Sequence, residues 1–590
     1  MDNISKSLAT NKHIKKHSLP ATRWRIPQEN PEGERRLVQE LRIHPLLSKI
    51  LVNRSLADPD AAKKYLQPSL NDLHNPFLIK DIRKGLNRLI RAITGREKIV
   101  IYGDYDVDGI TSMVILYDFL QKTGADVSFY IPHRTREGYG LNRSAVDAIR
   151  DRGTALLITV DCGISDHSEI AHARSTGMDT IVLDHHEIPE VLPAAEAVIN
   201  TQRSDCPFPF KPLAGVGIVF NFLIALRGQL REIGFWKDRP YPNLREYLDL
   251  VALGTIGDIS PLVDENRIFA KIGLELINQG GRPGIQALRE VSGATHQPVD
   301  STAASFSLIP RINAAGRIAS AEDAIHLLLE KDRAAALKLA RKLDGLNRDR
   351  QSMERSILSS ILEDIEPMGE RDLPPVFVFA SRDWHPGVIG IVASRLVEQY
   401  YRPAILISLK DGIGKGSGRS IQEFNLHRGM SQCQSRLLSY GGHRFAGGMT
   451  IREEDIPSFR SMMEEFVRSD VPVSDLVPTT AIDARCELED ISFELVCQLE
   501  NLAPFGSMNP EPILHARRVV VSQTSVVGNN HLKMRVTSRG ASCPSIWFGR
   551  GHFAGALQES DLDIVFTPQI NHWNGTSTIQ LKLKDMARSA

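Results

Sequence analysis

The stretch Ile99–Ser112, IVIYGDYDVDGITS, decides how the rest of the chain is interpreted. Its first three residues are apolar and β-branched, which predicts a short buried strand. Three aspartates follow at alternate positions, Asp104, Asp106 and Asp108. If the backbone stays extended, alternate side chains point the same way, so these carboxylates crowd one side of the strand's end. Like charges this close repel, and a divalent cation, which prefers oxygen ligands, relieves the repulsion.

Two other interpretations of the aspartates have to be weighed. An EF-hand calcium loop would use the same aspartates followed by Gly109, but it requires glutamate at position twelve, where this chain has Ile115. The preceding segment also has the pattern of a strand, whereas an EF-hand needs a helix there. A solvated acidic turn is the usual role of an aspartate-rich loop, so the choice depends on the rest of the chain.

The composition is that of a soluble globular protein with several domains. The chain has 590 residues, of which 42% are hydrophobic and 24% are charged. No run approaches the roughly 20 apolar residues that span a bilayer, and we expect no secretory signal. The six cysteines are scattered without a CxxC pair, which argues against disulfides and zinc thiolates and favours the cytoplasm. Basic and acidic residues number 71 each, so the net charge gives no support to nucleic-acid binding.

A regular alternation of strands and helices predicts a parallel sheet with helices packed on both faces. The strands are expected at 99–102, 127–131, 156–160 and 180–183, and the helices between them at about 111–122, 142–150 and 165–176. Ligands of such sheets bind beyond the carboxyl ends of the strands. Three of the four strands end in aspartate or histidine, in the sequences GDYDVDG, DCG and DHHE. Solvated turns would not be placed so consistently, so the pattern favours a metal site.

A pair of histidines, His185 and His186, follows the fourth predicted strand beside Asp184. Imidazole nitrogen next to carboxylate oxygen suits manganese and similar transition metals better than magnesium or calcium alone. A further aspartate, Asp258, follows the apolar segment 247–254, where an isolated aspartate is usually a cap or turn residue. Together the clusters provide ligands for two ions, and two ions about 3.5–4 Å apart are the usual arrangement for in-line attack at a phosphate.

The segments GDYDVDGITS, VDCGIS, LDHHE and LGTIGDISPL resemble the four metal-binding motifs of the DHH phosphoesterase superfamily. Five further segments narrow the resemblance to the RecJ family of bacterial single-stranded-DNA-specific 5′ exonucleases: IPHRTREGYGL, LIPRINAAGRI, WHPGVIGIVASRL, GKGSGRS and GGHRFAGGM. The match extends from about Leu66 to the C-terminus. It implies an α/β fold in which a parallel-sheet DHH catalytic domain is joined by a long helix to a smaller α/β DHHA1 domain, with a C-terminal OB-like β-barrel.

The resemblance also implies roles for matching residues. The expected metal ligands are Asp104, Asp106, Asp108, Asp161, His185, His186 and Asp258, of which Asp108, Asp161 and His186 are the expected catalytic residues. Asp161 is expected to bridge the two ions, whereas Asp184 is expected to orient the histidine pair. Asp104 is either a ligand or a carboxylate behind the ligands. Tyr102 stands where some relatives have a ligand histidine, which it is not expected to replace.

A second set of residues is expected to bind the DNA backbone or a 5′-terminal phosphate: Arg134, Arg311, Arg317, Ser417, Arg419 and His443. Arg311 and Arg317 lie in a predicted loop at 308–317, and a guanidinium fork suits phosphate. The glycine-rich segment 414–420 is predicted as a loop that brings backbone amides, Ser417 and Arg419 to one phosphate, with Arg134 opposite. For His443, contact with the scissile region and a structural hydrogen bond stay equally open.

We expect six parts along the chain. They are a basic disordered tail at 1–28, a helical region at 29–97, the DHH domain at 98–265, a helical connector at 266–366, the DHHA1 domain at 367–465 and an OB-like nucleic-acid-binding domain at 472–590. In the last part, basic residues lie among Trp547, Phe548 and Trp573, a mixture suited to non-specific single-strand binding. The alternative is that the aromatic residues belong to the core.

The combined prediction is an exonuclease that degrades single-stranded DNA from 5′ to 3′ to mononucleotides, with two divalent ions, Mn²⁺ or Mg²⁺, in DNA repair and recombination. Polarity and products are implied by the resemblance alone. We expect a cytoplasmic monomer without membrane contact, with a single-strand-binding protein and a helicase as further partners. Two other functions stay open: a phosphodiesterase for small nucleotides, which would not need the OB-like domain, and a non-catalytic replication scaffold, which would have lost metal ligands.

Overall fold

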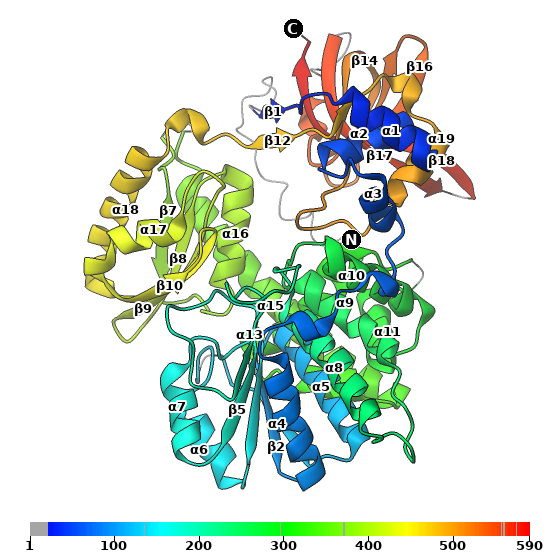
Figure 1. The fold of residues 1–590 in the computed structure, drawn as a ribbon. Coiled ribbons are helices and arrows are strands. Elements are labelled where there is room, and N and C mark those ends of the chain that lie inside the picture. The colour runs from blue at the N-terminus through cyan, green and yellow to red at the C-terminus, as the bar shows by residue number, and fades with distance from the viewer. Residues whose placement is uncertain are drawn as a thin grey trace. The chain divides into compact units, whose positions relative to one another are not determined.

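The computed structural model describes residues 22–134, 136–295, 297–369, 372–555, 557, 561–573 and 575–589 (Figure 1). The chain divides into two compact units. One unit contains Pro68–Glu354 and Pro504–Pro510, and the other contains the residues before Pro68, Arg355–Ala503 and the residues from Glu511 onward. The boundary near residue 354 falls inside the longest helix, α15 (Arg333–Ile365).

The first unit is built on a parallel five-stranded sheet with the order β3-β2-β4-β5-β6. Its strands are β2 (Ile99–Gly103), β3 (Val127–Tyr130), β4 (Leu156–Val160), β5 (Asp179–Leu183) and β6 (Ala197–Ile199). Strands β2 and β4 are buried along their whole length, as their nearly continuous apolar sequences favour. The four predicted strands are present. A fifth strand, β6, was not predicted because its three residues are too few to give a recognisable pattern.

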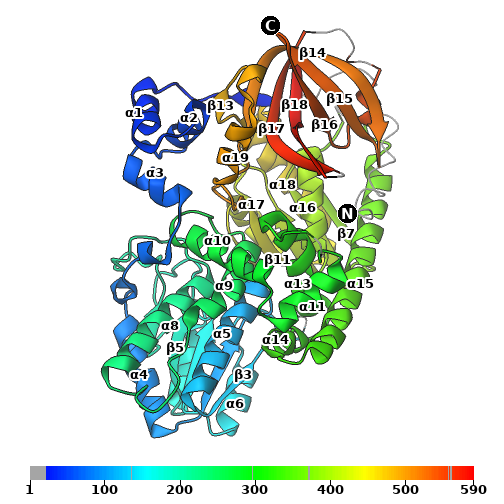
Figure 2. The ribbon, with the colours of Figure 1, turned by 90° about the vertical axis from the view of Figure 1, so that its right-hand side faces the viewer.

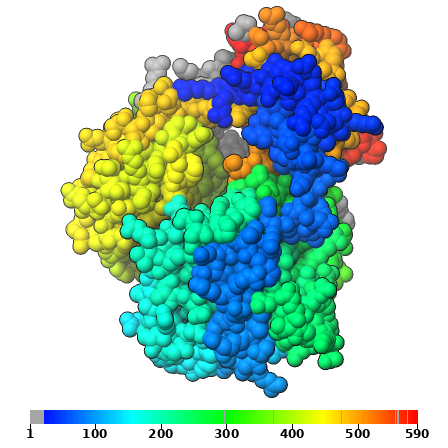
Figure 3. All heavy atoms as spheres, in the orientation of Figure 1, coloured from blue at the N-terminus to red at the C-terminus, as the bar shows by residue number. Residues whose placement is uncertain are grey.

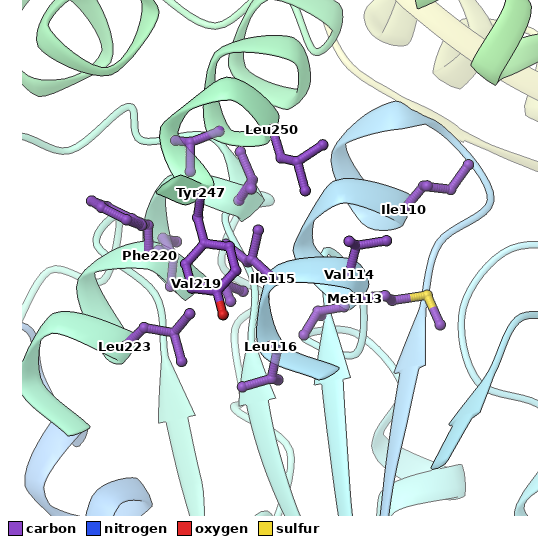
Figure 4. Close-up of a cluster of buried hydrophobic side chains, with 14 of the residues drawn as sticks. Ile110, Met113, Val114, Ile115, Leu116, Val219, Phe220, Leu223, Tyr247 and Leu250 are labelled. Carbon is purple, nitrogen blue, oxygen red and sulfur yellow. The ribbon is translucent and has the colours of Figure 1, made fainter. Parts of the chain in front are cut away.

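Helices cover both faces of this sheet, as predicted. Ile99 and Ile101 of β2 face one apolar cluster, and Val100 and Tyr102 face another. The first cluster contains residues of α4 (Ile82–Gly95), α5 (Val107–Thr123) and α8 (Gly215–Glu232), and the second contains residues of α6 (Arg143–Asp151) and α7 (His167–Ser175) (Figure 1). Figure 4 shows side chains of α5 and α8 meeting in the first cluster. The sheet is therefore enclosed, and its carboxyl edge is left for ligands.

The rest of this unit is helical. It contains α9 (Leu248–Gly257), α10 (Asp264–Gln279), α11 (Pro283–Ser292), the short α12 (Ser301–Ala303), a π-helical turn η5 (Ala304–Leu308), α13 (Ile309–Ile318) and α14 (Glu322–Leu329), followed by α15. The predicted loop at 308–317 is wrong, because this segment forms α13. Its proline, Pro310, lies in the first turn, where a missing N–H costs no helical hydrogen bond. None of the helices formed by the described residues is both long and apolar enough to cross a membrane.

The second unit contains a smaller mixed sheet with the order β10-β11-β9-β8-β7. Its strands are β7 (Phe377–Ser381), β8 (Ala404–Lys410), β9 (Ile413–Arg419), β10 (Leu437–Gly442) and β11 (Ala446–Arg452), packed with α16 (Ile389–Tyr400), α17 (Leu426–Gln432) and α18 (Ile456–Asp470). The predicted loop at 414–420 is wrong as well, because most of it is β9, which pairs with β8 and β11. Its alternate glycines leave room for apolar neighbours: a Cβ on Gly418 would lie 2.8 Å from Leu426.

The predicted OB-like barrel is confirmed as a closed five-stranded barrel (Figure 2). Its strands are β14 (Leu514–Val527), β15 (His531–Ser538), β16 (Ala541–Trp547), β17 (Asp561–Trp573) and β18 (Thr576–Arg588). Closure comes from the pairing of β14 with both β15 and β17 and from the parallel pairing of β16 with β18. A closed barrel leaves no sheet edge open to unwanted pairing.

The N-terminal part of the second unit packs on the barrel region. It contains α1 (Pro31–Leu41), α2 (Pro45–Asn53) and α3 (Pro59–Leu66), and the dark blue atoms of these helices lie beside orange atoms of the barrel in Figure 3. Arg54, which follows α2, forms a bidentate ion pair with Asp483, with N–O distances of 2.8 and 3.1 Å. This pair and the packing fix the helices to the start of the barrel domain.

The prediction of a disordered tail at 1–28 needs a correction. Residues 1–21 lie outside the described residues, but Arg23–Arg25 forms a strand, β1, that pairs in parallel with β12 (Thr479–Ala481). The Trp24 indole Nε1 donates a hydrogen bond to Asp585 of β18 at 2.7 Å. Strand pairing and the indole hydrogen bond hold residues 23–25 in place. The polar composition of the segment did not indicate this order.

Candidate active site

The aspartates after β2 do not all lie on extended backbone: Asp106 keeps an extended conformation, whereas Asp108 lies in the first turn of α5. The condition under which alternate carboxylates would share one side of a strand is therefore not met. Asp106 is the N-cap of α5, and its Oδ1 accepts hydrogen bonds from the N–H groups of Asp108 and Gly109, at 2.9 and 3.2 Å. Aspartate is a favourable N-cap because it satisfies N–H groups that the helix leaves free. The turn needs glycine, because a Cβ on Gly109 would lie 2.4 Å from the Asp104 carbonyl oxygen.

The structure nevertheless brings the seven predicted ligand residues together. They form three groups in which the ligand atoms lie within 4.8 Å of one another: Asp161, His185 and His186; Asp108, His185 and Asp258; and Asp104, Asp106 and Asp161. Asp161 and His185 each belong to two groups, so the groups form one continuous cluster, here called the acidic cluster. Each of the three groups could hold a metal ion, and their carboxylate and imidazole ligands suit Mn²⁺ and similar cations.

Several atoms of the acidic cluster make no hydrogen bond to any described residue. Among the described residues, the buried atoms Asp104 Oδ1, Asp161 Oδ1 and His185 Nε2 accept or donate no hydrogen bond. Asp161 Oδ1 and His185 Nε2 lie only 3.2 Å apart. A buried polar atom without a partner costs about 1–3 kcal/mol, and metal ions would satisfy all three. The residues present therefore fit a divalent cation.

The electrostatics of the acidic cluster lead to the same conclusion. Burial raises the pKa of the Asp104 and Asp161 carboxyls well above the ordinary value, and neighbouring aspartates raise it further. Burial and the charge of Asp258 raise the pKa of Asp108 to about 7. The carboxyls favour protonation when they are alone, whereas a divalent ion supplies the positive charge that keeps them ionised.

Adding Mn²⁺ to the metal-free protein is expected to raise its melting temperature, because a ligand that binds only the folded state stabilises it. At a free metal concentration 100 times Kd, the free energy of unfolding increases by about 2.7 kcal/mol. Scanning calorimetry in Mn²⁺ and in EDTA, with K⁺ as the control cation, measures this effect. Equal melting temperatures in Mn²⁺ and EDTA would contradict the prediction.

Asp184 lies behind the histidine pair. Its Oδ1 accepts hydrogen bonds from the backbone N–H groups of His185 and His186 and from His186 Nδ1, the last at 2.7 Å. Its Oδ2 accepts from the Ile164 N–H at 2.9 Å. Although burial opposes ionisation, the hydrogen bond and charge of His186 lower the Asp184 pKa to about 2. These contacts fix the orientation of the His186 ring and leave Nε2, which lies 3.3 Å from the Tyr139 hydroxyl, as the ring nitrogen that could bind a metal. They support the orienting role expected for Asp184.

Two contacts of the acidic cluster were not found from the sequence. The N–H groups of Gly215 and Val216, in the first turn of α8, donate to the two carboxylate oxygens of Asp108 at 2.7 and 2.8 Å. Tyr139, from the segment REGYG, donates its hydroxyl hydrogen to the Asp161 carbonyl at 3.3 Å, and its ring lies edge-on to His186. The motif around Tyr139 could have indicated its contact with the cluster, whereas no sequence feature indicated the contact of Gly215.

Tyr102 contributes no atom to the three ligand groups. Its hydroxyl donates a hydrogen bond to the Gly140 carbonyl at 2.7 Å, and its ring stacks on Tyr130. Tyr102 therefore packs behind the cluster.

The three arginines expected to face DNA from this unit have different surroundings. The Arg134 guanidinium lies over the Tyr105 ring, 4.9 Å from its centroid, beside the aspartate turn. Arg311 is on α13 and pairs with Asp344 of α15 at 2.9 Å, with its side chain 14% exposed. Arg317 lies in the last turn of α13. Arg311 is therefore already engaged in an ion pair, which the prediction of a phosphate-binding loop did not include.

Ser417 and Arg419 form a second candidate site, on β9. They lie two residues apart, so they share one face of the strand, and Arg419 Nη1 donates to Ser417 Oγ at 3.2 Å. A Cβ on Gly390 would lie 2.8 Å from Ser417 Oγ and 3.1 Å from Arg419 Nη2, so both side chains lie against the first turn of α16. Within the described part of the chain, no side chain caps that turn. Its N–H groups, the hydroxyl and the guanidinium make a site suited to a phosphate group.

The remaining predicted DNA contacts lie near the two sheets of the second unit. His443 follows β10 and donates its backbone N–H to the Ala446 carbonyl at 2.8 Å. In the barrel, Trp547 is 2% exposed and stacks on Phe553, so it belongs to the core, as the alternative interpretation had it. Phe548 is 49% exposed and is available for contact. The side chain of Trp573 lies outside the described part of the chain.

Family models match three parts of the chain. They are the DHH family N-terminal domain at residues 98–255, the DHHA1 domain at 374–469 and the RecJ OB domain at 482–585. The matches fall on the parallel sheet, the mixed sheet and the barrel, and they confirm the predicted architecture.

Curated proteins and solved structures described as RecJ match most of the chain. It is 38% identical to the single-stranded-DNA-specific exonuclease RecJ of Bacillus subtilis (strain 168), over 96% of this chain and 71% of that relative. It is 36% identical to the protein of the same description from Escherichia coli (strain K12), over 83% of this chain and 86% of the relative. The fold is similar to crystalline RecJ in complex with Mn²⁺ from Thermus thermophilus, with a TM-score of 0.83 and 29% identity over 96% of this chain and 80% of that chain. A structure of RecJ from the same organism in complex with Mg²⁺ matches with a TM-score of 0.74 and 28% identity, over 96% of this chain and 79% of that chain.

Proposed function

Because the chain belongs to the RecJ family of single-stranded-DNA-specific exonucleases, we propose that its acidic cluster hydrolyses single-stranded DNA from the 5′ end to mononucleotides. The chain is a metal-dependent exonuclease whose substrate is single-stranded DNA. The observation that supports the proposed site is the buried, continuous cluster of seven ligand residues at the carboxyl edge of the sheet. An enzyme without DNA as substrate would not need the OB domain, and a scaffold would not need this cluster.

Mn²⁺ or Mg²⁺ would be held by Asp104, Asp106, Asp108, Asp161, His185, His186 and Asp258. Divalent ions there supply Lewis acidity, which activates water and stabilises the negative charge that develops on the phosphate. Asp161 would hold neighbouring ions together, since it belongs to two of the ligand groups. Asp184 keeps His186 oriented, and the first turn of α8 keeps the Asp108 carboxylate in position.

The first test uses a single-stranded oligonucleotide labelled at its 3′ end, with Mn²⁺ or EDTA, and a blunt duplex as the control. We expect metal-dependent, stepwise shortening of the single strand and no attack on the duplex. Loss of the label as a mononucleotide at the start would show the opposite polarity. Binding without shortening would point to a scaffold, and cleavage of dinucleotides alone would point to a small-nucleotide phosphodiesterase.

The Ser417 and Arg419 site is proposed to bind the 5′-terminal phosphate. Arg419→Ala is expected to reduce the preference for 5′-phosphorylated over 5′-hydroxyl oligonucleotides by about tenfold, because a charge-assisted hydrogen bond contributes about 1.5–3 kcal/mol. The ratio of kcat/KM for the two substrates measures this preference. Arg428→Ala, an exposed arginine on α17, is the control variant. An unchanged ratio in Arg419→Ala would remove this assignment.

Arg134, Arg317 and Arg311 are proposed as further contacts to the DNA backbone, and His443 as a contact near the scissile phosphate. For Arg311, contact with DNA would compete with the ion pair to Asp344.

We further propose that the enzyme works in the cytoplasm as a monomer, in DNA repair and recombination, together with a single-strand-binding protein and a helicase. Free cysteines, several of them buried, support a reducing compartment. The substrate of the enzyme supports the two proposed partners, because a helicase produces single-stranded DNA and a single-strand-binding protein covers it.

A further inference from the structure

Three large apolar side chains of the first unit are largely exposed. Ile259 and Met508 are each 74% exposed, and Phe306 is 69% exposed. Isolated apolar residues on a surface are ordinary. These three need a separate explanation because each lies in an unusual backbone conformation and because their segments are connected.

The backbone at these positions is not what the residue types prefer. Ile259 has φ 63° and Met508 has φ 57°, in the left-handed region that favours glycine. A β-branched residue there is a rare outlier, and burial does not explain it, because the Ile259 side chain faces solvent. Phe306 lies in the π-helical turn η5, a conformation that is frequent at functional sites. Strained backbone of this kind persists only where the surrounding structure holds it, and it clusters at active sites and ligand-binding segments.

The three segments lie together at the end of α9. The Leu262 N–H donates to the Ser507 carbonyl at 2.8 Å, which ties the segment after α9 to the segment of Met508. The Ser301 hydroxyl donates to the Phe505 carbonyl at 2.6 Å, which ties the start of the Phe306 region to the same segment. Ile309, the first residue after η5, would lie 3.2 Å from a Cβ on Gly257.

The position of Ile259 relates this surface to the acidic cluster. Ile259 directly follows Asp258, whose carboxylate belongs to one of the three ligand groups. At the other end of the connected segments, α13 follows η5 and reaches the aspartate turn, where Asn313 Oδ1 accepts the Val107 N–H at 2.7 Å. Both ends of the connected segments therefore reach the residues that surround the proposed metal ions.

We propose that Ile259, Phe306 and Met508 form an apolar rim that contacts the sugars and bases of single-stranded DNA next to the scissile phosphate. The inference rests on the proposed function. A phosphate held by the cluster brings its own sugar and base to the adjacent surface, and the faces of unpaired bases are apolar and free to stack. In a duplex these faces are already stacked, so the apolar rim also favours single strands.

The test distinguishes a loss of DNA contact from a loss of folded structure. Ile259→Gly places glycine at a left-handed position, so the melting temperature and the Mn²⁺ affinity are expected to stay the same or rise. The Kd for a 3′-labelled oligothymidine, measured by fluorescence anisotropy in EDTA, and the KM for its cleavage are expected to increase about tenfold in the double variant Ile259→Gly, Phe306→Ala. Hydrolysis of bis-p-nitrophenyl phosphate, which has no bases, is expected to change less than twofold.

The matched control is Ile233→Ala, an exposed isoleucine directly after the far end of α8. Met508→Ala gives an independent variant if the double variant folds poorly. Unchanged Kd and KM would overturn the proposed contact between the apolar rim and DNA. The exposed residues would then be better explained as a protein-binding surface. If the wild-type protein binds oligothymidine but does not shorten it, the proposed function fails, while the comparison of Kd values still tests the rim.

Discussion

Asp161→Asn is expected to reduce exonuclease activity at least about a thousandfold while leaving single-strand binding within about twofold. Asp161 belongs to two of the three ligand groups, so losing its charge weakens the attachment of neighbouring ions at once. A thousandfold loss corresponds to about 4 kcal/mol of lost transition-state stabilisation, which is of the size expected when metal catalysis fails. Asparagine is the substitution of choice because Asp161 has φ 59°, a conformation that asparagine adopts more readily than alanine.

The experiment compares kcat on a 3′-labelled oligonucleotide in Mn²⁺, oligonucleotide affinity in EDTA, and Mn²⁺ affinity by calorimetry. Asp161→Ala is a second variant that removes both oxygens. Asp151→Asn, at the exposed end of α6, is the matched control and is expected to behave as wild type. Turnover at the wild-type rate in Asp161→Asn would refute the assignment of the site. Loss of DNA binding in proportion to activity would assign Asp161 to substrate binding.

The position of the predicted ligand residues, and of Asp184 behind them, could be predicted because parallel strands end at the same edge of a sheet. Asp161 and Asp184 directly follow β4 and β5, and the register of neighbouring strands places these ends together. This argument needs no knowledge of side-chain contacts. Asp258 was harder, because it follows the helix α9 and comes to the cluster through helix packing. Only the resemblance to a family connected it with the others.

The errors in secondary structure share one physical origin. Proline and glycine were interpreted as signs of loops in 308–317 and 414–420. Pro310 instead occupies the first turn of a helix, and the glycines of β9 are covered by side chains from neighbouring elements, such as Met449 over Gly416. Tertiary packing decides the structure of such segments, and a single sequence does not contain that packing.

The contact between Gly215 and Asp108 could not be predicted at all. The two residues are 107 positions apart, and Gly215 lies in the run AGVGIVF, which looks like an ordinary helix start. In the structure the first turn of α8 satisfies both Asp108 oxygens through backbone N–H groups, and backbone groups leave no trace in residue type. The only sequence feature is the absence of a side chain at residue 215.

Gly215→Ala is therefore expected to have the second-largest effect, reducing kcat by about 100-fold and Mn²⁺ affinity by about tenfold. The added Cβ would lie 3.0 Å from Asp108 Oδ2, from Asp161 Cβ and from Asp161 Oδ1. Ordinary contacts between such atoms are about 3.5–4.0 Å, so the two carboxylates or the first turn of α8 must move by several tenths of an ångström. Misplacement on the order of 1 Å can reduce turnover about 100-fold, and disturbed support of a metal ligand reduces affinity about 10–100-fold.

The stability of this variant distinguishes a positioning role from a general loss of structure. Alanine in a helix is favoured over glycine by about 0.5–1 kcal/mol, which offsets part of the strain, so the metal-free melting temperature is expected to change by only a few degrees. Gly228→Ala, on the same helix, is the matched control because its Cβ would meet no atom within 4 Å. It is expected to keep wild-type kcat and Mn²⁺ affinity and to gain slightly in stability. If Gly215→Ala instead keeps its Mn²⁺ affinity and its activity, the cluster tolerates movement of Asp108, and the first turn of α8 serves the fold alone.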